Sequence, residues 1–185
     1  FPTTPGVFDP SFNGGTCDGY PCIDTFVTRF GTDRRTLVYS TFLSGSRHDQ
    51  GIAVAVDDDG RATVTGITDS VDFPTTPGAY DTSFNGVENG LEDGFVARLS
   101  TDGSTLVYGT FLGGNRQEWP AAIAIDDSDH AYVTGWTGSR DFPTTPGALD
   151  TLCDGIYCDD GFVTSLSADG GALNYSTFLG GIDSD

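Results

Sequence analysis

Two short acidic segments contain the densest groups of potential metal ligands in this chain. Their members are Asp57, Asp58, Asp59, Asp126, Asp127 and Asp129. Carboxylate oxygens grouped in one tight turn are the ligands that Ca²⁺ prefers in proteins. Neither segment has the spacing of an EF-hand loop, and aspartate is also a common residue of purely structural turns. The sequence therefore identifies these aspartates as candidate calcium ligands, with an ordinary acidic turn as the alternative.

The four cysteines fall into two local pairs. Four residues separate Cys17 from Cys22, and four separate Cys153 from Cys158. This spacing predicts two small disulfide loops, which are typical of an oxidising, extracellular compartment. A zinc site made of all four cysteines would require the two loops to meet, and it usually has tighter spacing within each pair. We therefore expect the disulfides Cys17–Cys22 and Cys153–Cys158.

Candidate glycosylation sites are of two kinds. Asn174 stands in the only N-x-S/T sequon, inside a predicted strand, where a glycan fits only if that strand edge is exposed. Threonine pairs between prolines are candidate O-glycan acceptors, namely Thr3, Thr4, Thr75, Thr76, Thr144 and Thr145. The structural alternative is that these threonines only favour an extended backbone.

Groups for hydrolytic catalysis are scarce. The only histidines are His48, in a polar turn, and His130, at the start of a predicted strand. They occupy different positions of the repeat described below, and no Gly-x-Ser-x-Gly segment accompanies them. Trp119 and Trp136 could line a sugar-binding groove, but aromatic residues at matching positions of the repeats favour packing. We therefore expect no enzymatic activity.

All of these groups belong to one repeated unit. The hexapeptide Phe-Pro-Thr-Thr-Pro-Gly divides the chain into the repeats 1–72, 73–141 and 142–185, the last of which contains only its first two predicted strands. Its prolines fix φ and lack backbone donors, so the hexapeptide is expected to be a stiff extended connector. Because the chain begins inside a connector, we expect it to be a processed product or a slice of a longer polypeptide.

Four short apolar runs follow the connector and a Gly- and Asp-rich loop in each full repeat. They span 25–30, 36–43, 52–56 and 62–68 in the first repeat, and 94–100, 105–112, 121–125 and 131–137 in the second. Asp-Gly turns between runs predict antiparallel hairpins. We expect each repeat to form its own four-stranded meander. Because both faces of the runs are apolar, the sheets should stack like β-propeller blades. The predicted fold is all-β, either open or part of a larger propeller or fibre.

The charge of the chain excludes some partners. The sequence has 27 acidic and 8 basic residues, a net charge of −19, which disfavours nucleic acid and anionic membrane surfaces. No apolar run approaches the roughly 18 residues of a membrane span, so we expect no membrane insertion.

Several segments together resemble one family. The segments are DFPTTPGAYD (72–81), DGFVARLS (93–100), LVYGTFLGG (106–114) and AYVTGWT (131–137). They are similar to the bacterial and archaeal seven-bladed β-propeller repeat (SBBP) family, and the likeness covers essentially the whole chain. The resemblance implies propeller-type sheets in a large secreted or cell-surface protein. It supplies no catalytic motif.

The expected function follows from these features. The leading hypothesis is a non-enzymatic, extracellular structural repeat protein, a segment of a cell-surface scaffold or filament. The alternative is a secreted binding module for carbohydrate or protein with Ca²⁺ support, and Ca²⁺ is the only cofactor candidate. Expected partners are identical subunits or a continuation of this chain, with glycans as a further candidate. In particular, the run 172–179 is expected to pair with a run of the 52–56 type from such a partner.

Overall fold

Antiparallel sheets provide all of the regular structure in this computed structural model, which describes residues 1–17, 19–86, 90–153 and 158–181. No helix occurs among these residues, and hence none that could span a membrane. The strands are β1 (Thr16–Cys17), β2 (Tyr20–Pro21), β3 (Thr25–Phe30), β4 (Leu37–Leu43), β5 (Asp49–Val56), β6 (Ala62–Thr68), β7 (Asp93–Leu99), β8 (Leu106–Phe111), β9 (Glu118–Ile125), β10 (Ala131–Thr137), β11 (Asp160–Leu166) and β12 (Leu173–Leu179).

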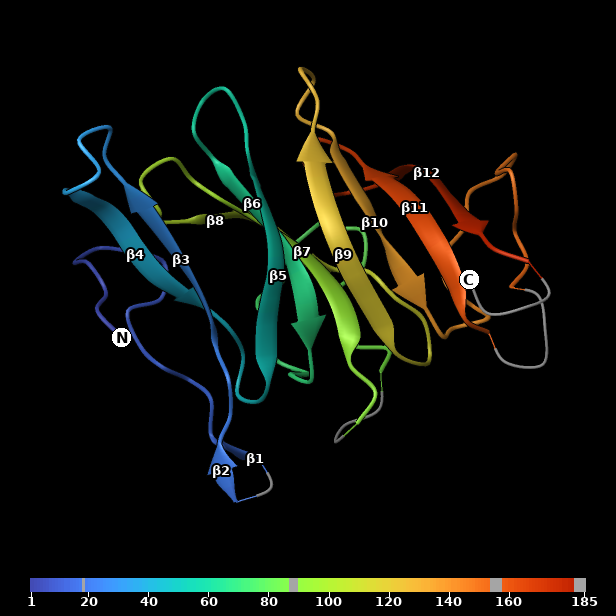
Figure 1. The fold of residues 1–185 in the computed structure, drawn as a ribbon, viewed down its shortest axis with the longest axis horizontal. Coiled ribbons are helices and arrows are strands. Elements are labelled where there is room, and N and C mark those ends of the chain that lie inside the picture. The colour runs from blue at the N-terminus through green and yellow to red at the C-terminus, as the bar shows by residue number, and fades with distance from the viewer. Residues whose placement is uncertain (18, 87–89, 154–157, 182–185) are drawn as a thin grey trace.

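Three sheets lie side by side along the molecule (Figure 1). Their strand orders are β3-β4, β5-β6-β7-β8 and β9-β10-β11-β12, and a small β1-β2 hairpin projects from the first sheet. Residues of neighbouring sheets together form two hydrophobic clusters within the described part of the chain. The predicted all-β fold with tandem antiparallel sheets is confirmed.

The strands group differently from the expectation that each repeat forms its own sheet. β6 of the first repeat pairs with β7 of the second, with Thr68 opposite Asp93. In the same way β10 of the second repeat pairs with β11 of the third, with Thr137 opposite Asp160. β4 does not pair with β5, and β8 does not pair with β9. Each four-stranded sheet is therefore shared by two consecutive repeats.

Two kinds of link produce this offset. The short link 44–48 carries the chain from β4 into the next sheet, where β5 packs beside β9. The longer link 69–92, which contains the second connector, keeps β6 and β7 in one sheet. The two short strands β1 and β2 were not predicted, because a two-residue strand has no apolar periodicity to detect.

Each connector lies along the outer edge of a sheet. The backbone N–H groups of Thr4, Thr76 and Thr145 donate to the carbonyls of Ser40, Gly109 and Ser176, on β4, β8 and β12 respectively. The carbonyls that follow the connectors also accept from these strands, as from Phe178 N to Asp150 O at 3.1 Å. Such cover keeps an outer strand from recruiting other chains.

This arrangement corrects the expectation for the run 172–179. β12 is covered by the connector of its own repeat. The equivalent strands β4 and β8 do not pair with β5 and β9, so the strand pairing within the chain does not support a run of the 52–56 type as the partner of β12. Among the described strands, β3, β5 and β9 each pair with a strand on one side only, and β3 lies at the other end of the molecule from β12 (Figure 1).

The first residue of the connector anchors it to the sheet. Phe73 is buried and packs on Phe95 of β7, with 4.3 Å between ring centroids, and on Phe111 of β8 at 6.1 Å. Phe142 repeats these contacts with Phe162 at 4.5 Å. The second and third connectors therefore fill the same aromatic position of their sheets.

We predict that Phe73→Ala costs about 3–5 kcal/mol of unfolding free energy, because it empties a filled aromatic site. Phe1→Ala is the matched control, since Phe1 is the equivalent residue of the first connector but is 60% exposed. It should cost much less. Urea unfolding followed by circular dichroism measures both, and equal losses would contradict the anchoring role of Phe73.

Candidate functional site

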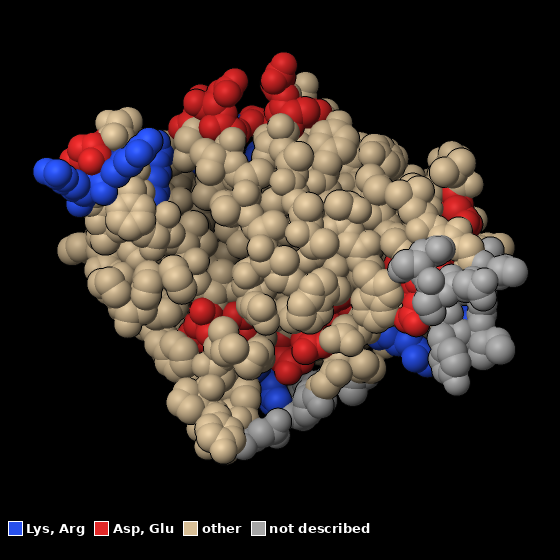
Figure 2. All heavy atoms as spheres, viewed as in Figure 1, with Lys and Arg blue, Asp and Glu red and all other residues tan. Residues whose placement is uncertain are grey.

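The two predicted acidic turns lie beside each other at one end of the strands. They join β5 to β6 and β9 to β10, and Figure 2 shows their acidic side chains gathered at the top of the molecule. A hollow of about 90 Å³ separates them, and it is lined by Val56, Asp57, Asp58, Ile125, Asp126, Asp127 and Asp129. Two segments that are far apart in the sequence thus form one acidic site.

An arginine lies between the carboxylates of these two turns. Arg61 Nε lies 2.7 Å from Asp57 Oδ2, and its Nη2 lies 2.7 Å from Asp129 Oδ2 and 3.1 Å from Asp59 Oδ2. Burial alone would raise the pKa of Asp57, but hydrogen bonds and charge from Arg61 hold this pKa below its usual value. The guanidinium therefore pairs with carboxylates of both turns and ties the turns together.

Asp126 is occupied within its own turn. Its oxygens accept from the backbone of His130 at 2.9 Å and from the Tyr132 hydroxyl at 3.0 Å, and the His130 ring contacts it at 3.0 Å. Burial would raise the pKa of Asp126, but these hydrogen bonds lower it to about 2. The described residues contain no group of three or more His, Cys, Asp or Glu placed to hold a metal. Calcium at these turns stays a prediction.

We predict that Arg61→Gln makes the protein respond to calcium. The change leaves three carboxylates without their cation, so the melting temperature in chelator should fall by about 2–4 °C. Millimolar Ca²⁺ should restore most of this loss while shifting the unmodified protein less. Arg35→Gln removes the same charge from an exposed turn and serves as the control. Equal calcium responses in all three proteins would contradict the bridging role of Arg61.

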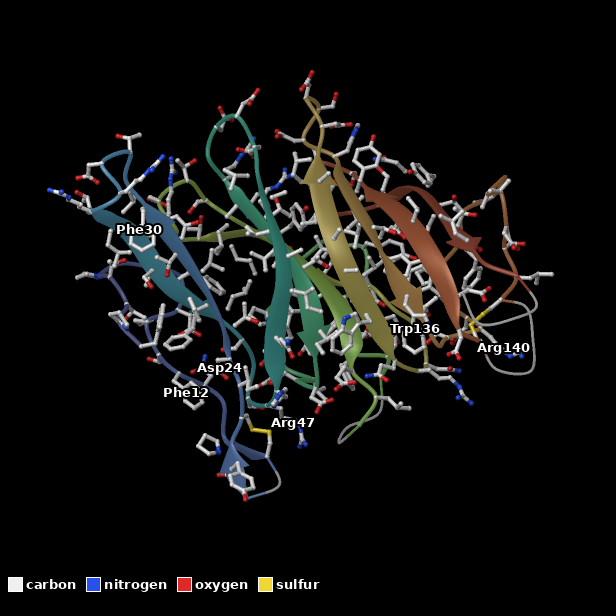
Figure 3. The ribbon with its side chains drawn as sticks, viewed as in Figure 1. Phe12, Asp24, Phe30, Arg47, Trp136 and Arg140 are labelled. Carbon is white, nitrogen blue, oxygen red and sulfur yellow. A yellow bond between two sulfur atoms is a disulfide. The ribbon has the colours of Figure 1, made fainter. Side chains whose placement is uncertain are left out.

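The structure joins the cysteines in the predicted pairs, Cys17–Cys22 and Cys153–Cys158. The first disulfide lies at the projecting β1–β2 hairpin (Figure 3). The second is buried in the cluster between the two four-stranded sheets. Two such bonds fit an oxidising, extracellular environment.

The candidate glycosylation residues differ in what their side chains do. The hydroxyls of Thr4, Thr76 and Thr145 accept hydrogen bonds from backbone N–H groups of the outer strands. This favours the structural interpretation for these three. Thr3 donates to the carbonyl of Pro10, while Thr75 and Thr144 lie half-buried in the connectors.

Asn174 has an exposed side chain on β12 whose amide donates to Ser165 Oγ at 3.2 Å. Ser176, the third residue of its sequon, is buried and donates to the carbonyl of Pro143. Glycosylation at Asn174 and at the threonines stays a prediction.

The two histidines do not lie together. His48 precedes β5, where its Nδ1 accepts from the backbone of Ile23 at 3.4 Å, whereas His130 lies in the turn after β9. Because β5 and β9 are equivalent strands packed beside each other, the two rings are at opposite ends of the sheets. A shared catalytic role for them has no support in this geometry.

Buried carboxylates between the sheets are a feature that the sequence analysis did not identify. Asp93 begins β7, Glu118 begins β9, and both are fully buried. A β-carbon on Gly113 would lie 2.1 Å from Asp93 Oδ1 and 2.4 Å from Glu118 Oε2, so the two acids converge on this glycine. The sequence signal that could have identified them is the recurrence of an acidic residue at the start of equivalent strands, as in Asp93 and Asp160 or Asp49 and Glu118.

Burial is the main influence on the pKa of these carboxyl groups, and it raises the pKa of each. It raises the pKa of Glu118 to about 7, although hydrogen bonds from Ser139 and Thr137 oppose it. It also raises the pKa of Asp93 well above the usual value, assisted by the charge of Glu118. Asp49, the counterpart of Glu118 in the first repeat, has its pKa raised by burial to about 7 against hydrogen bonds from Thr68 and Ser70. The folded chain therefore retains protons that an unfolded chain would release.

We predict that the protein is more stable at about pH 5 than at about pH 8. An acid whose pKa is raised by folding contributes fully below its unfolded pKa, and this contribution is lost as the pH rises through the folded pKa. For Glu118 the rise from 4.5 to about 7 corresponds to on the order of 3 kcal/mol.

Glu118→Gln should remove part of this pH dependence, as measured by urea unfolding at both pH values. Asp102→Asn is the control, because hydrogen bonds from Ser100 and Ser104 lower the pKa of Asp102 to about 2, outside this range. Stability that stays constant between the two pH values would contradict the prediction.

An open apolar groove lies between β3 and β5, and we call it the β3 groove. It has a volume of about 400 Å³ and is lined by Thr25, Phe26, Val27, Thr28, Arg29, Phe30, Tyr39, Gly51, Ile52, Ala53, Val54, Val56, Gly60, Ala62 and Val64. Phe26 and Phe30 are more than half exposed, and Figure 3 labels Phe30 at the end of β3.

Comparisons with known proteins add no family to this description. No protein-family model matches the chain, and no curated protein matches it.

Proposed function

We propose that the chain is a segment of a non-enzymatic, extracellular structural repeat protein that builds a scaffold or filament by stacking β-sheets. The observation that supports this most is the sharing of each four-stranded sheet by two consecutive repeats. A repeat in this arrangement cannot bury its own strands and is completed only by its neighbours, as in other repeat arrays. The resemblance of the repeats to secreted β-propeller repeats and the two disulfides support a place outside the cell.

Further contacts between repeats support a structural role. Arg29 of the first repeat donates to the carbonyls of Gly60 at 3.1 Å and Thr101 at 2.8 Å, both on the next sheet. Arg98, at the matching position of the second repeat, donates in the same way to the carbonyls of Asp129 and Ala168. The same arginine-to-carbonyl hydrogen bonds therefore join neighbouring sheets twice. Contacts repeated between successive units are what a scaffold built from copies of one unit needs.

We predict that adding repeats stabilises the whole array. One, two and three extra copies of residues 73–141, inserted after residue 141, should raise the unfolding midpoint with each copy, because every new repeat adds one interface. Small-angle X-ray scattering should show a maximum dimension that grows with each copy. Inserted copies that leave the midpoint unchanged would contradict the proposal. Specific capture of a glycan at the loop tips would favour the binding-module alternative.

A further inference from the structure

We infer that the β3 groove binds a β-hairpin formed by the third and fourth strands of a further copy of this repeat. The inference rests on the proposed array function and specifies the surface and the partner through which the array continues. The chain contains two such hairpins, β5–β6 and β9–β10. Each of them is already part of a four-stranded sheet. The occupant must therefore be an additional copy.

The edge of β3 shows what is missing. β7 and β11 are the strands equivalent to β3, and each pairs on one side with a preceding fourth strand, β6 or β10. β3 pairs only with β4 among the described strands. Its other edge is therefore free to accept a strand by β-augmentation.

Exposure of equivalent side chains locates the missing partner. Phe26 is 53% exposed, whereas Phe95 and Phe162, at the same position of the next repeats, are 0% exposed. Phe30 is 61% exposed, and its counterparts Leu99 and Leu166 are also fully buried. Since the repeats share their strand pattern, the difference arises from the absent inner hairpin.

The facing wall of the groove shows the same deficit. Val54 and Val56 of β5 are 58% and 63% exposed. Their counterparts on β9, Ile123 and Ile125, are partly buried and pack against the cluster that includes Val96 of the preceding sheet. A hairpin paired with β3 would complete the first sheet, and Val54 and Val56 of β5 could then pack against it.

Hydrogen bonds between the equivalent strands of the other sheets indicate which polar contacts this hairpin would make. Thr65 of β6 donates to the carbonyl of Phe95, and Thr134 of β10 donates to the carbonyl of Phe162, both at 2.8 Å. Arg98 Nε also donates to Thr63 Oγ1 of β6 at 2.8 Å. By the same register, the carbonyl of Phe26 and the Nε of Arg29 should bond threonines of the docked strand.

The test adds the missing hairpin to the full chain. A second copy of residues 49–72 is placed directly before Phe1, which recreates the natural junction between residue 72 and the connector. Amide hydrogen exchange should slow on the order of 100-fold at alternate residues of β3, because an edge strand becomes an internal one. The control is the same fusion with Gly66→Val in the added copy, where a β-carbon would lie 2.0 Å from the carbonyl oxygen of Gln50.

The outcomes separate this inference from the proposed function. Protection of β3 in the fusion, and its loss in the control, supports the hairpin as occupant. Unchanged exchange at β3 overturns the inference, even if extra internal repeats still stabilise the array. Concentration-dependent protection of β3 in the unmodified chain also overturns it, because the occupant would then be the β3 edge of a second chain.

Discussion

Strand pairing across the repeat boundary is the constraint on which the other features of this structure depend. The first strand of a repeat finds its inner partner in the fourth strand of the preceding repeat, as β7 does in β6. Backbone groups in a buried sheet must be paired, so a repeat without its predecessor has an incomplete sheet. This explains why β3 has an open edge while β12, at the other end, is covered by its connector.

Contacts between sheets extend this dependence. The Asp-Gly turn of one repeat lies on a tyrosine of the previous repeat. A β-carbon on Gly103 would be 2.5 Å from the Tyr39 ring, and one on Gly170 would be 2.4 Å from the Tyr108 ring. Both glycines also have positive φ values, of 68° and 69°, which glycine adopts without strain. The Asp-Gly turn therefore serves two purposes, because it closes a hairpin and allows the next sheet to approach.

The acidic residues do more than cover the surface with charge. Arg61 pairs with carboxylates of the two neighbouring turns, and burial keeps protons on carboxyls between the sheets. These two solutions differ because the turns reach solvent, where an ion pair costs little, whereas an unpaired charge in the interior is expensive. A net charge of −19 thus contains groups with opposite consequences for stability as the pH changes.

The sequence alone determined the all-β class, the positions of the longer strands, the Asp-Gly turns and the cysteine pairs, because each depends on residues near one another in the chain. It could not determine which strands share a sheet. A tandem repeat has the same local pattern wherever its unit is taken to begin, so a sheet within one repeat and a sheet shared by two are indistinguishable in sequence. Only the tertiary structure selected the shared arrangement, through the packing of β5 beside β9 and the pairing of β6 with β7. The same long-range packing brought Arg61 to Asp129 and Asp93 to Glu118, which no local pattern predicts.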